Sequence, residues 1–267
     1  MIDFHKDLAF ATTIKEFETH GVKVKRFEDG GLYSEKGDIL YVAPRKKVVY
    51  VKEGCRYIAP FAFSKESRRA VYREVWLPDG VEEICESAFA ACSNLWFVEL
   101  PTSLKVIERC AFWQCYKLDR LIIPKGIERI GEAAVLSNDI LMSADLEPVI
   151  VGNELFSSGS IAEDVIEIPD GIEYVSHMSF AFDNNLRKVV IPMSVKKVDD
   201  QAFWECKNLK GLVVKSPKVF LYNAFGWGYC YPTRLVVPKG RLSFYKPMGE
   251  LWEKRGGVPV EVVEGDF

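Results

Sequence analysis

The sequence has few of the features that usually mark an enzyme or a metal protein. Its 267 residues include only three histidines (His5, His20 and His177), which are scattered, and seven cysteines that form no C-x-x-C pair. This scarcity argues against a histidine-based relay, a zinc site and a thioredoxin-like motif. A Gly-rich phosphate loop and a G-x-S-x-G nucleophile elbow are also missing. We therefore expect no catalytic residue, no metal ligand and no bound cofactor.

Charge and hydropathy exclude further classes of protein. The formal net charge is −3 and the isoelectric point is about 5.8, which argues against nucleic acid as a partner. Apolar runs such as 121–123 are far shorter than the roughly 18 residues that span a bilayer, so we expect no membrane span. Asp3 and Asp7 argue against a signal peptide. The odd cysteine count fits a cytoplasmic protein.

What the sequence does contain is a repeat of 23 residues. In each copy a proline is followed eleven residues later by an anchor, in the pairs Pro78 and Phe89, Pro101 and Phe112, Pro124 and Val135, Pro169 and Phe180, and Pro192 and Phe203. Ala62-Phe63 and Ala224-Phe225 match the same pattern, and the 45 residues from Val135 to Phe180 leave room for one degenerate copy. The template P-x-x-V-x-x-I-x-x-x-A-F-x-x-C-x-x-L-x-x-V-x-I predicts short extended pieces separated by 3₁₀ or irregular turns.

Stacking of such units predicts a solenoid. A single unit cannot bury its apolar face, whereas stacked units bury each Leu, Val and Phe against its equivalent in the next rung. With adjacent strands about 4.8 Å apart, roughly eight rungs give a coil on the order of 40 Å long. We expect a mostly β, single-domain, right-handed solenoid over residues 28–240, irregular at 137–165.

The two ends are predicted to be caps, because the terminal repeats must shield an open core. Residues 1–27 contain Phe10, Ile14 and Phe17 at helical spacing, which predicts an amphipathic helix. Residues 241–267 predict a short helix interrupted at Pro247, since proline cannot donate a backbone hydrogen bond.

The repeat resembles the BspA-type (Treponema pallidum-type) leucine-rich repeat family. The motif I-x-x-x-A-F-x-x-C-x-x-L-x-x-V-x-I-P is clearest over residues 78–124 and 169–215. Residues 32–34 with 40–44, and residues 155–157, look like the hairpin-bearing variant repeat of that family. Its members are mostly bacterial and protist proteins, many of them secreted or on the cell surface. The resemblance implies adhesion or partner binding and carries over no catalytic residue. It favours secretion or the cell surface, whereas the cysteine count favours the cytoplasm.

One repeat column carries polar and sulfur-containing residues, namely Cys92, Cys115, Asn138, Asp183 and Cys206. Each of these side chains can contact backbone groups at a turn. We interpret the column as a structural ladder with weak S–H hydrogen bonds, and His177 as a lone exposed histidine.

The strand positions between buried residues predict the recognition face. In rung order they are Trp76, Glu99, Ile122, Glu167, Val190, Val213 and Val236, and most of them are apolar. An apolar strip on a solenoid face is typical of a partner surface. With the neighbouring column, it gives the predicted partner-binding residues Trp76, Trp96, Phe97, Ile122, Val190, Val213 and Val236. The alternative is a face covered by the protein's own hairpin insertions. Trp113 and Trp204 share another column, which fits either rung-edge packing or binding.

Three functions follow from this pattern. The first is a non-enzymatic module that presents an extended solenoid face to a protein or a glycan, in an adhesin-like manner. The second is a structural or oligomerising scaffold without a ligand of its own, with a homodimer as one form. The third is a hydrolase whose carboxylates come together across rungs.

Overall fold

The computed structural model describes residue 8 and residues 11–64, 71–118, 120–135, 141–143, 147–159, 163–226 and 230–267, with the backbone alone at 141–143. Residue contacts divide the chain into two compact units, residues 1–144 and 145–267. Each unit is a β-solenoid, and the structure has about 8 turns with few helices, which confirms the predicted repeat fold. The division into caps at 1–27 and 241–267 around a solenoid at 28–240 stays a prediction.

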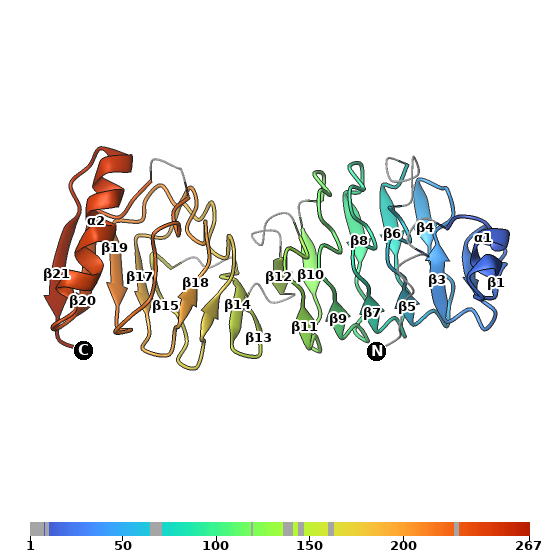
Figure 1. The fold of residues 1–267 in the computed structure, drawn as a ribbon, viewed down its shortest axis with the longest axis horizontal. Helices are drawn as coiled ribbons and strands as arrows, with labels where there is room; N and C mark the ends of the chain where they lie inside the picture. Colours follow the sequence, from blue (N-terminus) through green and yellow to red (C-terminus); the bar gives the residue numbers. More distant parts are fainter. Residues whose placement is uncertain are drawn as a thin grey trace. The chain divides into compact units, whose positions relative to one another are not determined.

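In the first unit each rung, meaning one turn of the coil, adds short strands to two sheets (Figure 1). One sheet has the order β1-β2-β3-β5-β7-β9-β11 and consists of β1 (Val24–Arg26), β2 (Leu32–Ser34), β3 (Ile39–Val42), β5 (Tyr57–Ile58), β7 (Glu83–Ile84), β9 (Val106–Ile107) and β11 (Arg129–Ile130). The strands of the other layer are β4 (Val48–Tyr50), β6 (Glu74–Trp76) and β8 (Phe97–Glu99), followed by the pair β10 (Leu121–Ile123) and β12 (Leu141–Ser143).

The second unit is built in the same way. One sheet has the order β13-β14-β16-β18 and consists of β13 (Val149–Val151), β14 (Glu154–Ser157), β16 (Tyr174–Val175) and β18 (Lys197–Val198). The other has the order β15-β17-β19-β20-β21 and consists of β15 (Val165–Glu167), β17 (Lys188–Ile191), β19 (Gly211–Val214), β20 (Arg234–Pro238) and β21 (Glu261–Gly265). Pairing between rungs is parallel, as stacking of equivalent strands requires.

Antiparallel hairpins begin both units. β1, β2 and β3 form a meander in the first unit, and β13 and β14 form a hairpin in the second. In each case the last hairpin strand continues into the parallel stack, through β3 with β5 and through β14 with β16. Both hairpin-bearing variant repeats are therefore confirmed, and the second of them produces part of the predicted irregular stretch 137–165.

The anchor phenylalanines stack along the core of each unit. Ring centroids are 4.3 Å apart for Phe63 and Phe89, and 4.9 Å apart for Phe89 and Phe112. In the second unit Phe203 lies 5.0 Å from Phe180 and 5.5 Å from Phe225. These spacings lie near the strand separation, because equivalent side chains follow the pairing of the strands that carry them.

The backbone around each anchor has an unusual conformation that the sequence did not predict. Around the anchors from Phe63 to Phe203, residues two before or two after the anchor have φ between +50° and +64°, a region that costs an L-residue about 1–2 kcal/mol. The positions before the anchor are Phe61, Ser87, Cys110, Ala133, Met178 and Gln201. Those after the anchor are Ala91, Gln114, Phe182 and Glu205. Because the conformation recurs at fixed positions, it belongs to the design of the rung.

A short helix lies beside the first hairpin. α1 (Ile14–Thr19) begins at Thr13, whose hydroxyl accepts a hydrogen bond from the Glu16 amide while the Glu16 carboxylate accepts one from the Thr13 amide. This reciprocal pair satisfies two donors that a helix start otherwise leaves free. Phe17 is fully buried beneath it. α1 contains Ile14 and Phe17 of the predicted amphipathic helix, and Phe10 lies outside the described residues.

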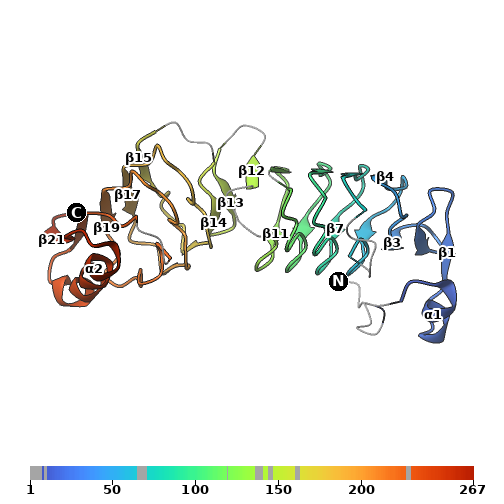
Figure 2. The same cartoon turned by 90° about the horizontal axis from the view of Figure 1, so that it is seen from above.

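A longer helix packs at the C-terminal end of the second unit. α2 (Leu242–Gly256) lies against β20 and β21, which Figure 2 shows clearly. Its Trp252 meets the ring of Phe225 edge to face, with centroids 5.0 Å apart. The predicted interruption at Pro247 is wrong, because the helix continues through that residue. A proline near the start of a helix removes a single hydrogen bond, and the buried side chains Tyr245, Met248 and Trp252 hold the remainder in place.

The cysteine column is the structural ladder that its spacing predicts. The Sγ atoms of Cys92, Cys115 and Cys206 donate to the carbonyl oxygens of Phe63, Phe89 and Phe180, at 3.6, 3.2 and 2.9 Å. Each thiol thus contacts the anchor residue of the preceding rung. In the same column the Asp183 carboxylate accepts from the amides of Asn185 and Leu186. Asn138 lies outside the described residues.

Candidate binding surface

Four aromatic side chains gather on the outer face of β4, β6 and β8 in the first unit. They form the outer aromatic cluster, defined as Tyr50, Trp76, Trp96 and Phe97. The ring centroids are 6.0 Å apart for Tyr50 and Trp76, 4.8 Å for Trp76 and Phe97, and 5.9 Å for Trp96 and Phe97. Tyr50 is 67% exposed, Trp96 49% and Trp76 37%. The cluster is therefore continuous and open to solvent.

Strand alternation places Tyr50, Trp76 and Phe97 outside the core, while Trp96 precedes β8. Val49, Val75 and Val98 are the middle residues of the three strands, and all are buried. Their neighbours must point the other way, since successive side chains of a strand alternate between the two faces. The register pairs Tyr50 with Trp76, so their rings stand side by side on adjacent strands.

Charged residues surround the cluster. Arg45, Lys46 and Lys47 lead directly into β4, Arg73 precedes β6, and all four are exposed. Glu74 and Glu99 lie on the cluster's own strands. The ion pairs between described residues involve none of these four cations, although the net charge of the protein is −3. The outer aromatic cluster is therefore bordered by a locally basic surface.

The other predicted site residues divide between the two units. Ile122, on β10 of the first unit, is exposed by 41%. Val190, Val213 and Val236 form one row across β17, β19 and β20 of the second unit. Trp76, Trp96 and Phe97 lie together in the first unit, and the valine row belongs to the second unit.

Val213 has little exposed area, and its role as a partner-binding residue stays a prediction. Its side chain is on the outer face, since Leu212 and Val214 fill the core, yet it is only 9% exposed. Val190 and Val236 flank it on either side and are themselves half-buried. The ammonium of Lys215 also lies 2.6 Å from the Glu167 carboxylate, in an ion pair that crosses β17. The row is therefore only partly exposed.

Sequence reasoning missed Tyr50, the most exposed member of the cluster. Val49 and Val75 pair across β4 and β6 but are 26 residues apart, whereas Val75 and Val98 are 23 apart. The three additional residues removed Tyr50 from the repeat register. The alternation in Val48-Val49-Tyr50, aligned by its buried valine, is the signal that finds it.

The repeated tryptophans outside this face have mixed environments. Trp113 is exposed, while Trp204 is half-buried and lies 5.4 Å from the ring of Phe182. Trp204 fits rung-edge packing and Trp113 leaves both interpretations open. Trp227, two residues after the anchor Phe225, lies outside the described residues.

His177, Cys115 and Cys206 are engaged in structural contacts. His177 is exposed, and its Nδ1 lies 2.7 Å from the Asp200 carbonyl oxygen of the next rung. Burial raises the pKa of Cys115 and Cys206 to about 12, so these thiols are protonated at neutral pH. Across the described ranges, no group of three or more His, Cys, Asp or Glu side chains could hold a metal ion. Neither α1 nor α2 is long and apolar enough to cross a membrane.

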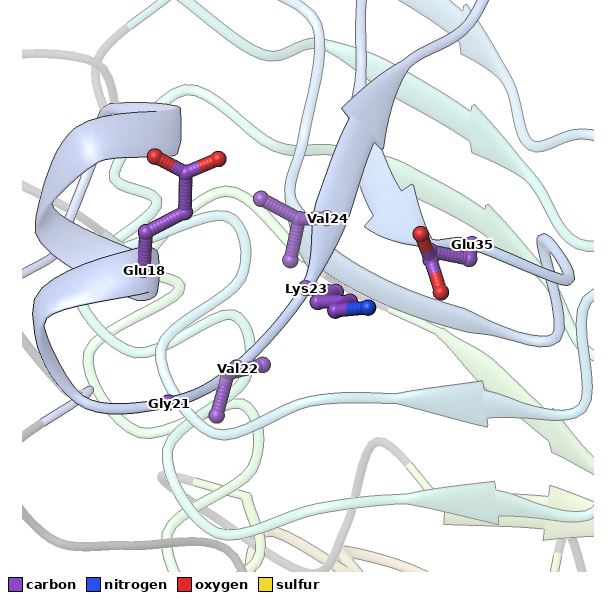
Figure 3. Close-up of a pocket in the computed structure, with 6 residues that line it drawn as sticks. All are labelled: Glu18, Gly21, Val22, Lys23, Val24 and Glu35. Atoms are coloured by element: carbon purple, nitrogen blue, oxygen red, sulfur yellow. The ribbon is translucent and has the colours of Figure 1, made fainter.

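A shallow pocket of about 400 Å³ lies beside α1 (Figure 3). Glu18, Lys23 and Glu35 line it together with Gly21, Val22 and Val24. The three charged side chains are exposed, and none of the lining residues combines burial with a free polar atom. The pocket therefore lacks the converging polar groups that fix a small ligand in place.

Comparison with known proteins identifies the repeat. Six copies of a BspA type leucine rich repeat region match residues 56–163 and 149–227. A solved leucine-rich cell surface protein from Faecalibacterium prausnitzii is 20% identical, with 82% of this chain and 73% of that chain covered and a TM-score of 0.50. The Treponema pallidum leucine-rich repeat protein is 21% identical over 85% of this chain and 93% of that chain, with a TM-score of 0.39.

A third structure is the pneumococcal vaccine antigen PcpA, which is 16% identical with a TM-score of 0.38. The alignment covers 90% of this chain and 47% of the antigen, so the chain spans about half the length of that structure. No curated protein matches the sequence. At these identities the structural similarity shows the fold alone.

Proposed function

Because this chain belongs to the BspA-type leucine-rich repeat family, we propose that it is a non-enzymatic interaction module that binds a partner protein through the outer aromatic cluster. Stacked rungs are a rigid support, and side chains on their outer face keep fixed separations. Recognition of this kind needs no mobile catalytic groups. It needs a surface whose burial releases water from apolar area.

The observation that carries the proposal is the continuity of the cluster. Tyr50, Trp76, Phe97 and Trp96 form an unbroken chain of ring contacts while each retains exposed area. Tyr and Trp are enriched among the residues that dominate binding energy at interfaces. If this surface served only to keep the protein soluble, the contacts between its aromatic rings would bury little apolar area and would contribute little stability. A partner that covers this face supplies the missing burial.

Ring orientation favours a protein partner over a glycan. The planes of Tyr50 and Trp76 are only 17° apart, so these two rings stack on one another across the strands. Their facing surfaces are already occupied, and a flat sugar ring would meet mainly their edges. A protein surface can fill the spaces between ring edges with aliphatic side chains. A glycan ligand, adhesion and a homodimer stay predictions from the sequence.

The proposal is tested by locating the partner and then removing the cluster. A photo-crosslinking amino acid at position 50 captures what binds this face in an extract of the source organism, and the captured protein is then purified. Calorimetry compares its affinity for the wild type and for the Tyr50→Ser, Trp76→Ser double variant. We expect at least a 100-fold loss, about 2.7 kcal/mol, because two central aromatic anchors are removed.

A matched control is available in the second unit. Phe220 and Tyr222 are also an exposed aromatic pair, with stacked rings 6.3 Å apart. The Phe220→Ser, Tyr222→Ser variant should bind the partner as the wild type does. Equal affinity of all three proteins would show that the cluster is not the binding surface. Binding only between copies of this chain would favour the scaffold function instead.

A further inference from the structure

The outer aromatic cluster ends at an unpaired strand. β4 is the first strand of the sheet β4-β6-β8 and pairs only with β6 (Figure 1). Among the described residues no strand lies hydrogen-bonded to its other side. An edge strand of this kind offers a row of backbone donors and acceptors to a further chain.

The backbone groups at this edge belong to Val48 and Tyr50. The Lys47 carbonyl accepts from the Glu74 amide and the Val51 amide donates to the Trp76 carbonyl, so odd-numbered residues face β6. Residues of a strand alternate in this respect, and the amides and carbonyls of Val48 and Tyr50 therefore point away from β6. Neither residue has a backbone hydrogen bond to any described group beyond the sheet. Val48 is 36% exposed and Tyr50 67%, so this edge is accessible to a further chain.

The charge beside this edge is positive. Arg45, Lys46 and Lys47 are three consecutive exposed cations that lead into β4, and Arg73 lies before β6. Their charges are not neutralised by ion pairs with other described residues, as noted for the border of the cluster. Such cations attract an acidic partner at long range and favour it in the bound state.

From these observations we infer that the edge of β4 binds an extended acidic segment of a partner protein, which adds a strand to the sheet. Backbone hydrogen bonds to Val48 and Tyr50 supply affinity without regard to sequence. Acidic side chains of the segment meet Arg45 and Lys46, and every second side chain packs beside Tyr50. Strand addition of this type is an established mode of peptide recognition. This inference rests on the proposed function, whose partner it describes.

A second copy of this chain is a poor occupant. The acidic strand that it could offer is β21, but the carboxylates there already have partners. Glu261 pairs with Arg234, Asp266 pairs with Lys239, and Glu264 accepts from the Gly240 amide. The charges of Glu261 and Asp266 are thus largely neutralised within the molecule. A segment with free carboxylates complements the β4 border better.

The test uses a capped nine-residue peptide in which Glu and Asp alternate with Val and Tyr. Binding to the full chain is followed by fluorescence anisotropy, and amide hydrogen exchange is measured at Val48 and Tyr50. We expect exchange at both amides to slow at least tenfold on saturation. The same peptide with Lys in place of the acids should bind at least tenfold more weakly. Unchanged exchange at Val48 and Tyr50 would overturn the inference, even where the peptide binds.

Backbone participation is tested separately from charge. Val48→Pro removes an outward amide at the first residue of an edge strand, a position where proline is tolerated. We expect at least a tenfold loss of peptide affinity, with Val48→Thr unaffected because it keeps the amide. Methylation of alternate amides in the peptide gives the same readout without altering the protein. Equal binding of the methylated and unmethylated peptides would contradict strand addition.

Charge is tested with the Arg45→Glu, Lys46→Glu variant. It should lose at least tenfold in affinity and most of the salt dependence, whereas Lys246→Glu, Lys254→Glu on α2 should retain both. A nine-nucleotide single strand of thymidine that competes with the peptide would identify nucleic acid as the occupant and overturn the inference. Concentration-dependent self-association abolished by Val48→Pro would identify a second copy instead. If Tyr50→Ser, Trp76→Ser abolishes partner binding while Val48→Pro does not, the proposed function stands and only the strand addition fails.

Discussion

The rings of Phe89 and Phe112 stack with their centroids 4.9 Å apart and their planes 8° from parallel. The amide of Phe89 also donates to the carbonyl of Ala111, next to its stacking partner, at 2.8 Å. The side-chain stack and the main-chain ladder therefore have the same period, close to the natural spacing of strands. Ring stacking and the main-chain hydrogen bond both hold each rung to the next. We therefore expect stability to depend more on the anchor than on any other position of the repeat.

Phe112→Ala should lower the free energy of unfolding by about 3–5 kcal/mol, because the surrounding rungs cannot collapse into the cavity. Phe112 is nearly inaccessible, and the matched control Phe220→Ala removes a phenylalanine that is largely exposed. We expect the control to lose less than about 1 kcal/mol. Urea denaturation of both variants measures the difference. A loss below about 1 kcal/mol for Phe112→Ala would contradict its place in the core.

Ala91→Gly should stabilise the protein, although glycine normally weakens a folded chain. Ala91 has a φ of +57°, where the side chain clashes with its own backbone, so removal of the Cβ relieves about 1–2 kcal/mol. The added entropy of glycine in the unfolded chain offsets about 0.5–1 kcal/mol. Thermal denaturation should show a net gain of up to about 1.5 kcal/mol. The neighbouring Ala90, also half-buried but without a positive φ, provides the control, since Ala90→Gly should destabilise.

The buried thiols should make stability fall at alkaline pH. Burial raises the pKa of Cys55, Cys115 and Cys206 from 9.0 to about 12. Between these values the folded chain retains protons that the unfolded chain releases. The free energy of unfolding is therefore unaffected below pH 9 and decreases as the pH rises toward 12, by about 1.4 kcal/mol per pH unit for each thiol.

Guanidinium denaturation at a series of pH values from 7 to 10.5 measures this slope. The control is Cys115→Ala, which should show a slope shallower by the contribution of one thiol. If the variant and the wild type have the same slope above pH 9, the thiol is not held protonated by the fold.

Aspartate should have different effects at two positions that the repeat pattern treats as equivalent. Val213→Asp buries a carboxylate among the valines of its row, so we expect a loss of about 2–4 kcal/mol in the free energy of unfolding. Ile122→Asp places the same group on an exposed position and should cost less than about 1 kcal/mol. Circular dichroism during urea denaturation distinguishes them. Similar losses at both positions would mean that Val213 is as accessible as Ile122.

The repeat period explains why much of the fold could be predicted. A buried valine, an anchor phenylalanine and a column cysteine recur at one spacing, so one rung predicts the rest. Trp76 and Phe97 followed from this repeat pattern, and Trp96 from its place beside Phe97. Tyr50 did not, because an insertion between β4 and β6 shifted it out of register.

Other features depend on contacts that no local pattern encodes. The positive φ positions before the anchors carry Phe, Ser, Cys, Ala, Met and Gln, which share no chemistry. The backbone of the rung imposes the conformation, and the side chains only tolerate it. Lys215 and Glu167 are 48 residues apart, so their ion pair over β17 depends on the stacking of three rungs. The low exposure of Val213 follows from the same stacking.

The cysteine ladder also has a direction that bears on how the protein is made. Every thiol donates backwards, to the anchor carbonyl of the preceding rung, while the amides of Phe63, Phe89 and Phe112 donate forwards to the rung that follows. A ribosome releases a 23-residue rung in about one to five seconds, N-terminal first. Each new rung therefore emerges next to a folded rung. The anchor carbonyl of that rung can accept from the new thiol, and its anchor amide still needs an acceptor. Within the second unit this growing end stays open until Trp252 has been synthesised and closes over Phe225.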